Sequence, residues 1–254
     1  MSASVRLEGL RVAFSGQEVL HGIDAFFPAT GVSALLGRSG SGKSTLLRSI
    51  NRLNEEFPGC ATSGRVLVDF GSGPVDVYSL PESGAKNGLS VHGLRTRLGM
   101  LFQTPNLFPV SVLRNIAMPL KLVGGADQKS IFATAQMVLQ QVGLWDELKD
   151  RLHAPAAELS GGQQQRLCLA RLLALKPSVL LLDEPTASLD VHASKEIEEL
   201  LQGLAANYSI IMVSHSLAQA RRMSGRMLIC EQGRITSELA PDASVSEETL
   251  AALL

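Results

Sequence analysis

The chain contains 254 residues and carries a formal net charge of −1. A chain of this length buries roughly three quarters of its unfolded surface, so it needs neither disulfides nor a structural metal to fold. The near-zero charge leaves no basic footprint, which argues against a protein that binds a duplex by neutralising its phosphates. Charged residues make up only 19% of the chain, and this favours some apolar surface for a partner.

The three cysteines, Cys60, Cys168 and Cys230, are odd in number, far apart and without CxxC spacing. This usage predicts structural thiols in a reducing compartment rather than a metal or redox site.

Two segments bear on membrane association. The first 16 residues contain Arg6, Glu8 and Arg11, where a signal peptide would need an apolar core. Residues 200–220 lack acidic and basic side chains but are interrupted by many polar residues, which is unsuitable for a spanning helix. We therefore expect a cytoplasmic protein without a transmembrane segment, and a buried strand at residues 209–213.

The amino-terminal part of the chain predicts strands before a βα unit. Residues 5–13 and 19–27 alternate in hydropathy on either side of a glycine, which is typical of an antiparallel hairpin. An apolar strand at residues 32–36, a glycine-rich turn and a helix at residues 44–53 follow, and this order indicates an α/β fold.

The middle of the chain changes character. Residues 58–93 are rich in Gly, Ser and Pro and predict a surface elaboration with one short strand at residues 65–69. An apolar strand is expected at residues 98–102. Helical periodicity then covers residues 112–122, 129–142 and 144–152.

The last part returns to an α/β pattern. A helix is expected from about residue 160 to residue 174, before Pro177. Residues 179–182 form a continuous apolar run, typical of a buried parallel strand, and a helix at residues 191–206 follows. The helical block from about residue 113 to residue 173 therefore predicts a helical subdomain inserted in an α/β core.

The strongest motif is a GxxxxGK[ST] run between an expected strand and an expected helix. Small residues let backbone N–H groups surround phosphate oxygens, and the helix N-terminus adds favourable partial charge. The lysine would neutralise the β- and γ-phosphates, and the serine hydroxyl after it would bind Mg²⁺. The run consists of Gly37, Arg38, Ser39, Gly40, Ser41, Gly42, Lys43, Ser44 and Thr45.

A second motif, Asp183 and Glu184, closes the apolar strand at residues 179–182. In a protein with a phosphate loop, an Asp at a neighbouring strand end reaches the magnesium ion, directly or through water. A Glu beside it can act as the general base that polarises the attacking water.

A third motif is a glycine turn at the start of a helix, formed by Ser160, Gly161, Gly162 and Gln163. Ser160 is the expected N-cap, and the glycine amides would be exposed to an anion. Because the chain already has one phosphate loop, both loops could serve one phosphate if two chains pair head to tail.

The order of these motifs along nearly the whole chain resembles the nucleotide-binding subunit of ATP-binding cassette (ABC) transporters. The resemblance spans about residues 5–233 and also includes Gln103, the run 188–190 and His215. It implies a P-loop NTPase core of the ABC type, with an N-terminal antiparallel β-subdomain and an inserted α-helical subdomain.

The resemblance also implies domain boundaries. Residues 4–236 would form a single ATP-binding domain, followed by a tail at residues 237–254. Within that domain, residues 4–102 and 176–236 would be the ATPase core with its β-subdomain. Residues from about 103 to 175 would be the helical subdomain that carries the glycine turn.

Further site residues follow from the resemblance alone. Phe14 resembles the aromatic residue that stacks on adenine. Gln103 resembles the glutamine that contacts magnesium and water, and His215 the histidine that contacts the γ-phosphate. Asp190 resembles the residue that links two sites across a dimer. The turn at Ser160 resembles the signature loop that meets the γ-phosphate held by a second copy.

The sequence outside these motifs resembles the phosphate-importing subfamily in four segments: residues 47–54, 99–109, 144–152 and 163–168. Departures occur at Leu107, at residues 187–188 and over residues 71–93. These departures leave the implied ATP chemistry intact and bear on the solute.

The expected protein is an ATPase that binds ATP and Mg²⁺ and powers phosphate import from the cytoplasmic face of the membrane. Its expected partners are a second copy of itself, a transmembrane permease docked near residues 103–113 and, indirectly, a solute-binding protein, with no nucleic acid. An importer of another oxyanion or an amino acid stays open as an alternative, as does a non-transport ABC ATPase. A P-loop kinase is disfavoured by the signature turn and His215.

Overall fold

The computed structural model describes residues 2–84, 89–125 and 127–239, and these residues form two compact units. The first unit draws its described residues from Met1–Gly99, Ser178–Glu184 and Leu204–Leu254. The second unit consists of Met100–Pro177 and Pro185–Gly203. Of the expected tail at residues 237–254, residues 237–239 belong to the strand Arg234–Leu239. The rest of that tail, residues 240–254, lies outside the described residues.

An antiparallel sheet forms one part of the first unit, with the strand order β2-β1-β4-β5. Its strands are β1 (Ser4–Phe14), β2 (Gln17–Phe27), β4 (Cys60–Asp69) and β5 (Pro74–Asp76). Ser15 and Gly16 both have positive φ between β1 and β2, which matches the two-residue turn that right-twisted hairpins prefer. The expected hairpin is confirmed, since Val5 pairs with Phe27 and Phe14 with Gln17.

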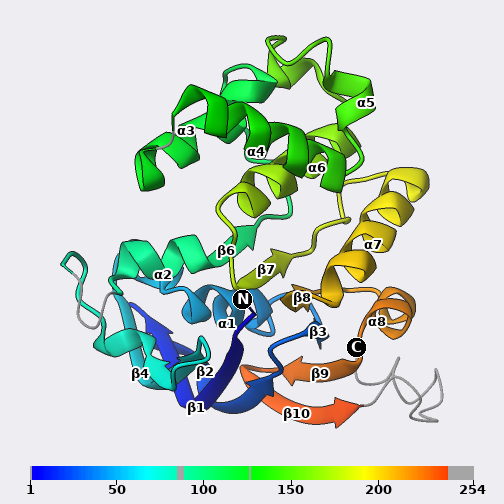
Figure 1. The fold of residues 1–254 in the computed structure, drawn as a ribbon. Helices are drawn as coiled ribbons and strands as arrows, with labels where there is room; N and C mark the ends of the chain where they lie inside the picture. The colour runs from blue at the N-terminus through cyan, green and yellow to red at the C-terminus, as the bar shows by residue number, and fades with distance from the viewer. Residues whose placement is uncertain (1, 85–88, 126, 240–254) are drawn as a thin grey trace. The chain divides into compact units, whose positions relative to one another are not determined.

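The second sheet has the order β10-β9-β3-β8-β7-β6 (Figure 1). Its strands are β3 (Gly31–Leu36), β6 (Leu98–Leu101), β7 (Val179–Asp183), β8 (Ser209–Val213), β9 (Arg226–Glu231) and β10 (Arg234–Leu239). β3 lies parallel to both β8 and β9, and β7 lies parallel to β8. All residues of β7 and β8 are buried, as expected for parallel strands covered on both faces.

Helices of the first unit complete the expected α/β pattern. They are α1 (Lys43–Ile50), the 3₁₀ turns η1 (Leu53–Glu56) and η2 (Val77–Ser79), α2 (Val91–Arg97) and α8 (Leu217–Met223). α8 contributes Ala220 to an apolar cluster with Ala34, Leu36, Met227 and Ile229 from β3 and β9.

The region expected as a surface elaboration holds more regular structure than its composition indicates. β4 begins five residues before the expected strand, and α2 begins within the segment. The Ser90 hydroxyl accepts a hydrogen bond from the Gly93 N–H and caps α2, while Val91 and Leu94 are buried. Two buried residues are too few to give a periodic signal, so pattern reasoning misses this helix.

The second unit is mainly helical. It contains α3 (Val112–Gly124), α4 (Gln128–Gln141), α5 (Trp145–Leu148), η3 (Ala156–Glu158), α6 (Gly161–Ala174) and α7 (Val191–Ala205) up to Gly203. Helix α5 ends at Leu148, four residues before the expected boundary, because the chain turns there. Further on, Pro155 forms an isolated antiparallel β-bridge with Ser111.

Residues Pro185–Gly203 also belong to this second unit, whereas the sequence analysis placed them in the ATPase core. The reason lies in contacts between α6 and α7. The Arg166 guanidinium pairs with Glu196 at 3.5 Å, and an added Cβ on Gly162 would lie 2.8 Å from the Ala193 Cβ. Among the described residues, no helix has the length and apolar character that crossing a membrane requires.

Candidate functional site

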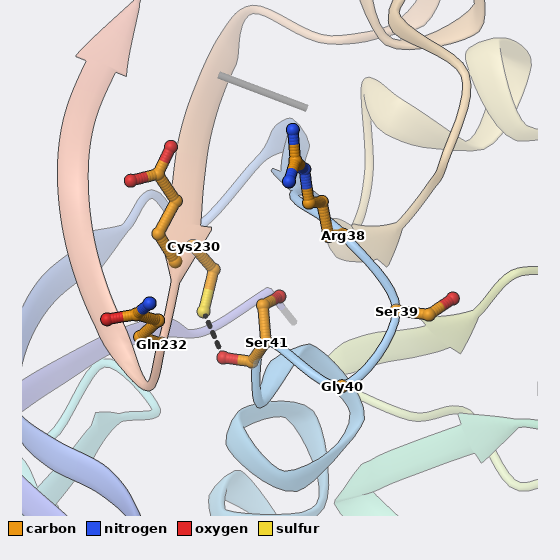
Figure 2. A pocket seen from close by; sticks show the side chains of 7 residues that line it. Arg38, Ser39, Gly40, Ser41, Cys230 and Gln232 are labelled. Atoms are coloured by element: carbon orange, nitrogen blue, oxygen red, sulfur yellow. Dashed lines mark hydrogen bonds between the residues drawn. The ribbon is translucent and has the colours of Figure 1, made fainter. Parts of the chain in front are cut away.

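The glycine-rich run forms a loop between β3 and α1 that can surround an anion. Gly37, Gly40 and Gly42 all have positive φ, a conformation that L side chains rarely adopt. Gly37 also packs closely, because an added Cβ would lie 2.0 Å from the Cys230 carbonyl oxygen. Figure 2 shows the loop against Cys230, whose thiol donates to the Ser41 carbonyl at 3.1 Å. The backbone around this loop is therefore fixed by β9.

Lys43, the first residue of α1, turns its ammonium group back to the loop. Its Nζ donates to the carbonyl oxygens of Gly37 at 2.7 Å and Arg38 at 2.8 Å. Burial lowers the pKa of Lys43, while the nearby Cys230 and Glu184 raise it. A buried cation beside a helix N-terminus makes the loop suited to phosphate.

Ser44 and Asp183 are 139 residues apart in sequence and meet in the structure. The Ser44 hydroxyl donates to Asp183 Oδ1 at 2.8 Å, and Arg48 Nη2 lies 3.4 Å from Asp183 Oδ2. Asp183 is 4% exposed, so its carboxylate is buried but has both a hydroxyl and a cation as partners.

Glu184 and His215 follow the neighbouring strands β7 and β8, and their side chains meet. His215 Nε2 lies 2.5 Å from Glu184 Oε1. Glu184 has φ 48°, and its N–H donates to the Val213 carbonyl at 3.2 Å. A non-glycine residue in this conformation is strained, and such strain persists where the surroundings fix the backbone, commonly at functional sites.

These groups line one open pocket of about 280 Å³ in the first unit. Its lining residues are Val19, Ser39, Gly40, Gly42, Lys43, Ser44, Thr45, Glu184 and His215. The pocket thus brings a phosphate-type loop, a carboxylate and an imidazole together, which suits phosphoryl chemistry with water as the nucleophile.

Phe14 is the last residue of β1 and is not among those lining residues. Its ring is half-buried and meets the Phe57 ring edge-on, with 6.2 Å between the ring centroids.

The Ser160 turn begins α6 in the second unit and is held by a complete capping box. The Ser160 hydroxyl accepts from the Gln163 N–H at 3.3 Å, and Gln163 Oε1 accepts from the Ser160 N–H at 3.0 Å. Gln163 Nε2 also donates to Glu147 at 2.6 Å. Ser160 and Gly161 themselves are exposed.

Gln103 and Asp190 also belong to the second unit. Gln103 is exposed and comes two residues after β6. Asp190 precedes α7 and accepts from the N–H groups of Ala193 and His192, both at 2.9 Å. The Ala193 hydrogen bond, followed by that from His192, lowers the pKa of Asp190.

Sequence reasoning misses four residues that support these sites: Arg48, Phe57, Glu147 and Cys230. Arg48 could have been found, since it lies four residues after Ser44 and therefore on the same face of α1. The other three come from segments distant in sequence, and no local pattern places them there.

Comparisons with known proteins give consistent matches. A protein-family model described as "ABC transporter" matches residues 20–187. The phosphate import ATP-binding protein PstB 2 of Listeria monocytogenes serotype 4b (strain F2365) is 41% identical over 227 residues, which cover 88% of this chain and 79% of that protein. The protein of the same name from Listeria innocua serovar 6a (strain ATCC BAA-680 / CLIP 11262) gives the same values.

Solved structures share the fold. The protein cbiO1 from Clostridium perfringens, part of the ABC transporter complex cbiONQ, has a TM-score of 0.76 at 27% identity, covering 98% of this chain and 92% of that chain. The ATP-binding cassette MJ0796, in a dimeric post-hydrolysis state bound to ADP and Pi, has a TM-score of 0.74 at 26% identity, covering 94% and 99%.

Proposed function

The chain belongs to the ABC transporter family as an ATP-binding, ATP-hydrolysing subunit, and on this premise we propose that it powers the import of inorganic phosphate through a separate permease. The observation that carries the proposal is the pocket that joins the Lys43 loop to Glu184 and His215. The 41% identity to phosphate import ATP-binding proteins supports the choice of solute.

ATP binding is assigned to the phosphate loop and to Phe14. In this proposal Lys43 exchanges its carbonyl partners for the β- and γ-phosphates, and the N–H groups of residues 37–45 surround those phosphates. Phe14, an aromatic side chain of the same unit at the end of β1, is proposed to stack on the adenine ring.

The residues at the loop fit a magnesium ion. Ser44 Oγ and Asp183 Oδ1 are hard oxygen donors 2.8 Å apart, and Mg²⁺ prefers one or two such ligands together with phosphate oxygens and water. No cluster of three or more His, Cys, Asp or Glu side chains suited to a metal occurs among the described residues, which agrees with a site completed by the nucleotide. When bound, Mg²⁺ would neutralise charge on the phosphates, and Gln103 is proposed as a further ligand.

Hydrolysis is assigned to Glu184 as the general base for the attacking water. His215 contacts the Glu184 carboxylate and lines the same pocket, so it can orient that carboxylate and donate to the γ-phosphate. The fixed backbone of Glu184 keeps the base in place before the substrate arrives.

A second copy is proposed to complete each site. The exposed Ser160 and Gly161, on a turn held by Gln163, would present N–H groups to a γ-phosphate bound by the partner copy. Asp190, directly before α7, would link the two ATP sites of the dimer. We propose that residues 4–236 form one ATP-binding domain, with residues 4–102 and 176–236 as its core and about 103–175 as its helical subdomain, although Pro185–Gly203 of that core belong to the same compact unit as the helical subdomain.

Docking to a permease is proposed at the segment from Gln103 to Leu113, which would place the subunit peripherally at the cytoplasmic face of the membrane. Phe108 is 39% exposed and borders a cavity of about 200 Å³ in the second unit, whereas Val112 is fully buried and belongs to the core. Closure of the dimer around ATP would move this segment and thereby the permease.

A reconstituted complex tests the solute. The chain would be assembled in vesicles with its permease and solute-binding protein, and ATP hydrolysis would be measured with phosphate or sulfate present. We expect phosphate to stimulate hydrolysis more strongly. Stronger stimulation by sulfate, or by an amino acid, would overturn the assignment of phosphate while leaving the ATPase assignment intact.

A further inference from the structure

The Arg48 side chain lies between the Asp183 carboxylate and the Phe57 ring. Its guanidinium lies 3.4 Å from Asp183 Oδ2 on one side and 5.8 Å from the centroid of the Phe57 ring on the other. All three residues belong to the first unit. The function assigned to the pocket above gives Arg48 no task.

The placement of Arg48 is set by its helix. Ser44 and Arg48 are four residues apart on α1, so their side chains share one face and both reach Asp183. The Asp183 carboxylate therefore has a hydroxyl on one oxygen and a cation on the other.

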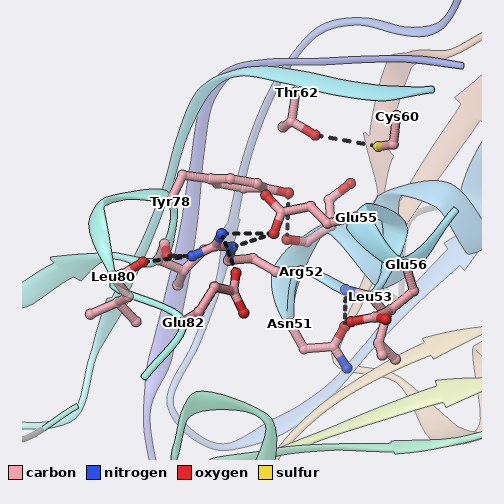
Figure 3. A network of polar contacts seen from close by, with 12 residues as sticks. Asn51, Arg52, Leu53, Glu55, Glu56, Cys60, Thr62, Tyr78, Leu80 and Glu82 are labelled. Atoms are coloured by element: carbon pink, nitrogen blue, oxygen red, sulfur yellow. Dashed lines mark hydrogen bonds and ion pairs between the residues drawn. The ribbon is translucent and has the colours of Figure 1, made fainter. Parts of the chain in front are cut away.

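Phe57 lies under the guanidinium, and its ring, which is 47% exposed, also contacts the Phe14 ring. It follows η1, and Arg52, the residue before η1, donates to the carbonyl oxygens of Val77 in η2 and of Leu80 directly after it, at 3.2 and 2.9 Å (Figure 3). Arg52 also pairs with Glu55 at 2.7 Å. The Phe57 face thus lies where Arg48 can pack over it.

The Arg48 guanidinium and a divalent cation would compete for the Asp183 carboxylate. A buried carboxylate is stable only when it is paired, and Arg48 supplies that charge to Asp183. A divalent cation bound between Ser44 and Asp183 would lie close to the guanidinium and be repelled by it. Nucleotide phosphates would reverse this balance, because they add negative charge at the same place.

We propose that Arg48 is a positioning residue that neutralises Asp183 in the nucleotide-free protein and weakens the binding of a divalent cation until nucleotide phosphates are present. The inference rests on the proposed magnesium site at Ser44 and Asp183. Arg48 would thereby couple the binding of the cation to the binding of the nucleotide, so that both bind to the site together.

Manganese binding to the nucleotide-free protein tests this inference. Free Mn²⁺ would be measured by electron paramagnetic resonance during titration of wild type, Arg48→Met, Arg48→Gln and Arg48→Lys, each shown to be folded by circular dichroism. We expect about five- to tenfold tighter binding for the two neutral variants, because one repelling charge is removed, and wild-type affinity for Arg48→Lys.

Two controls separate the causes. Arg65→Met removes an exposed arginine that pairs with Glu8 elsewhere in the same unit, so it changes the net charge equally and should leave Mn²⁺ affinity unchanged. Asp183→Asn should weaken Mn²⁺ binding in both the wild-type and the Arg48→Met background.

The outcomes are distinct. Unchanged or weaker binding in Arg48→Met and Arg48→Gln, with binding still dependent on Asp183, would overturn the inference and leave the proposed metal site standing. Binding that does not depend on Asp183 would overturn the metal site itself and the inference with it. Equal tightening in Arg65→Met would show that net charge alone, and not Arg48, controls the affinity.

Discussion

His215 Nε2 lies 2.5 Å from Glu184 Oε1, although the two residues are 31 positions apart in sequence. The contact follows from sheet topology, because Glu184 comes directly after β7 and His215 comes two residues after its parallel neighbour β8. Carboxyl ends of parallel strands meet at one edge, where ligands of open α/β sheets bind. The pair can therefore act on one water and one phosphate.

Replacing Glu184 by Gln should lower steady-state ATP hydrolysis by a factor of about 10² to 10⁴, because an amide cannot accept the proton of the attacking water. ATP binding should persist and favour an ATP-bound dimer, which size-exclusion chromatography would detect. Glu238→Gln serves as the matched control, since Glu238 is an exposed carboxylate of β10 that pairs with Arg226 and does not line the pocket. Unchanged hydrolysis in Glu184→Gln would refute the general-base assignment.

Replacing His215 by Ala should lower the rate of hydrolysis by about 10², the usual cost of losing one positioned donor. Nucleotide affinity, measured by equilibrium binding of a fluorescent ATP analogue, should change little because the phosphate loop is intact. His153→Ala removes an exposed histidine of the second unit and provides the comparison. A loss of affinity that accounts for the whole loss of rate would contradict the proposed role.

The two glycines of the Ser160 turn, Gly161 and Gly162, should respond differently to alanine. An added Cβ on Gly162 would lie 2.8 Å from the Ala193 Cβ, whereas an added Cβ on Gly161 would lie 3.8 Å from its nearest neighbour, a methyl carbon of Leu189. Gly162→Ala should therefore lower the free energy of unfolding by about 1–3 kcal/mol through overpacking. Gly161→Ala should stay within about 0.5 kcal/mol of wild type in denaturant titration. Equal losses in both variants would argue against this contact.

Asp190 should make stability depend on pH. Its folded-state pKa is lowered by the Ala193 and His192 N–H groups, so its contribution is present above the unfolded pKa and is lost as the pH falls through the folded pKa. Wild type should exceed Asp190→Asn in stability at neutral pH, and the gap should narrow in acid once the pH falls below the ordinary aspartate pKa of about 3.9. Urea titrations across that range would measure it, and a gap independent of pH would refute it.

Much of the local structure could be predicted from the sequence. The hairpin of β1 and β2, the strand-loop-helix unit around Lys43 and the buried strand β7 all carry strong patterns, because glycine at special dihedrals and period-2 or continuous apolar runs are local properties. The short helix α2 and the early end of α5 were not predictable in this way, because capping and tertiary turns decide them.

The sequence by itself determined which residue types the site contains and the order in which they occur, since each motif is a short local pattern. Only the tertiary structure decided which of them meet. Ser44 reaches Asp183, and Glu184 reaches His215, because β3, β8 and β7 are three consecutive parallel strands of one sheet. Some partners of the motifs, such as Cys230 on the Ser41 carbonyl, depend on packing between segments far apart in the chain, which no local pattern encodes.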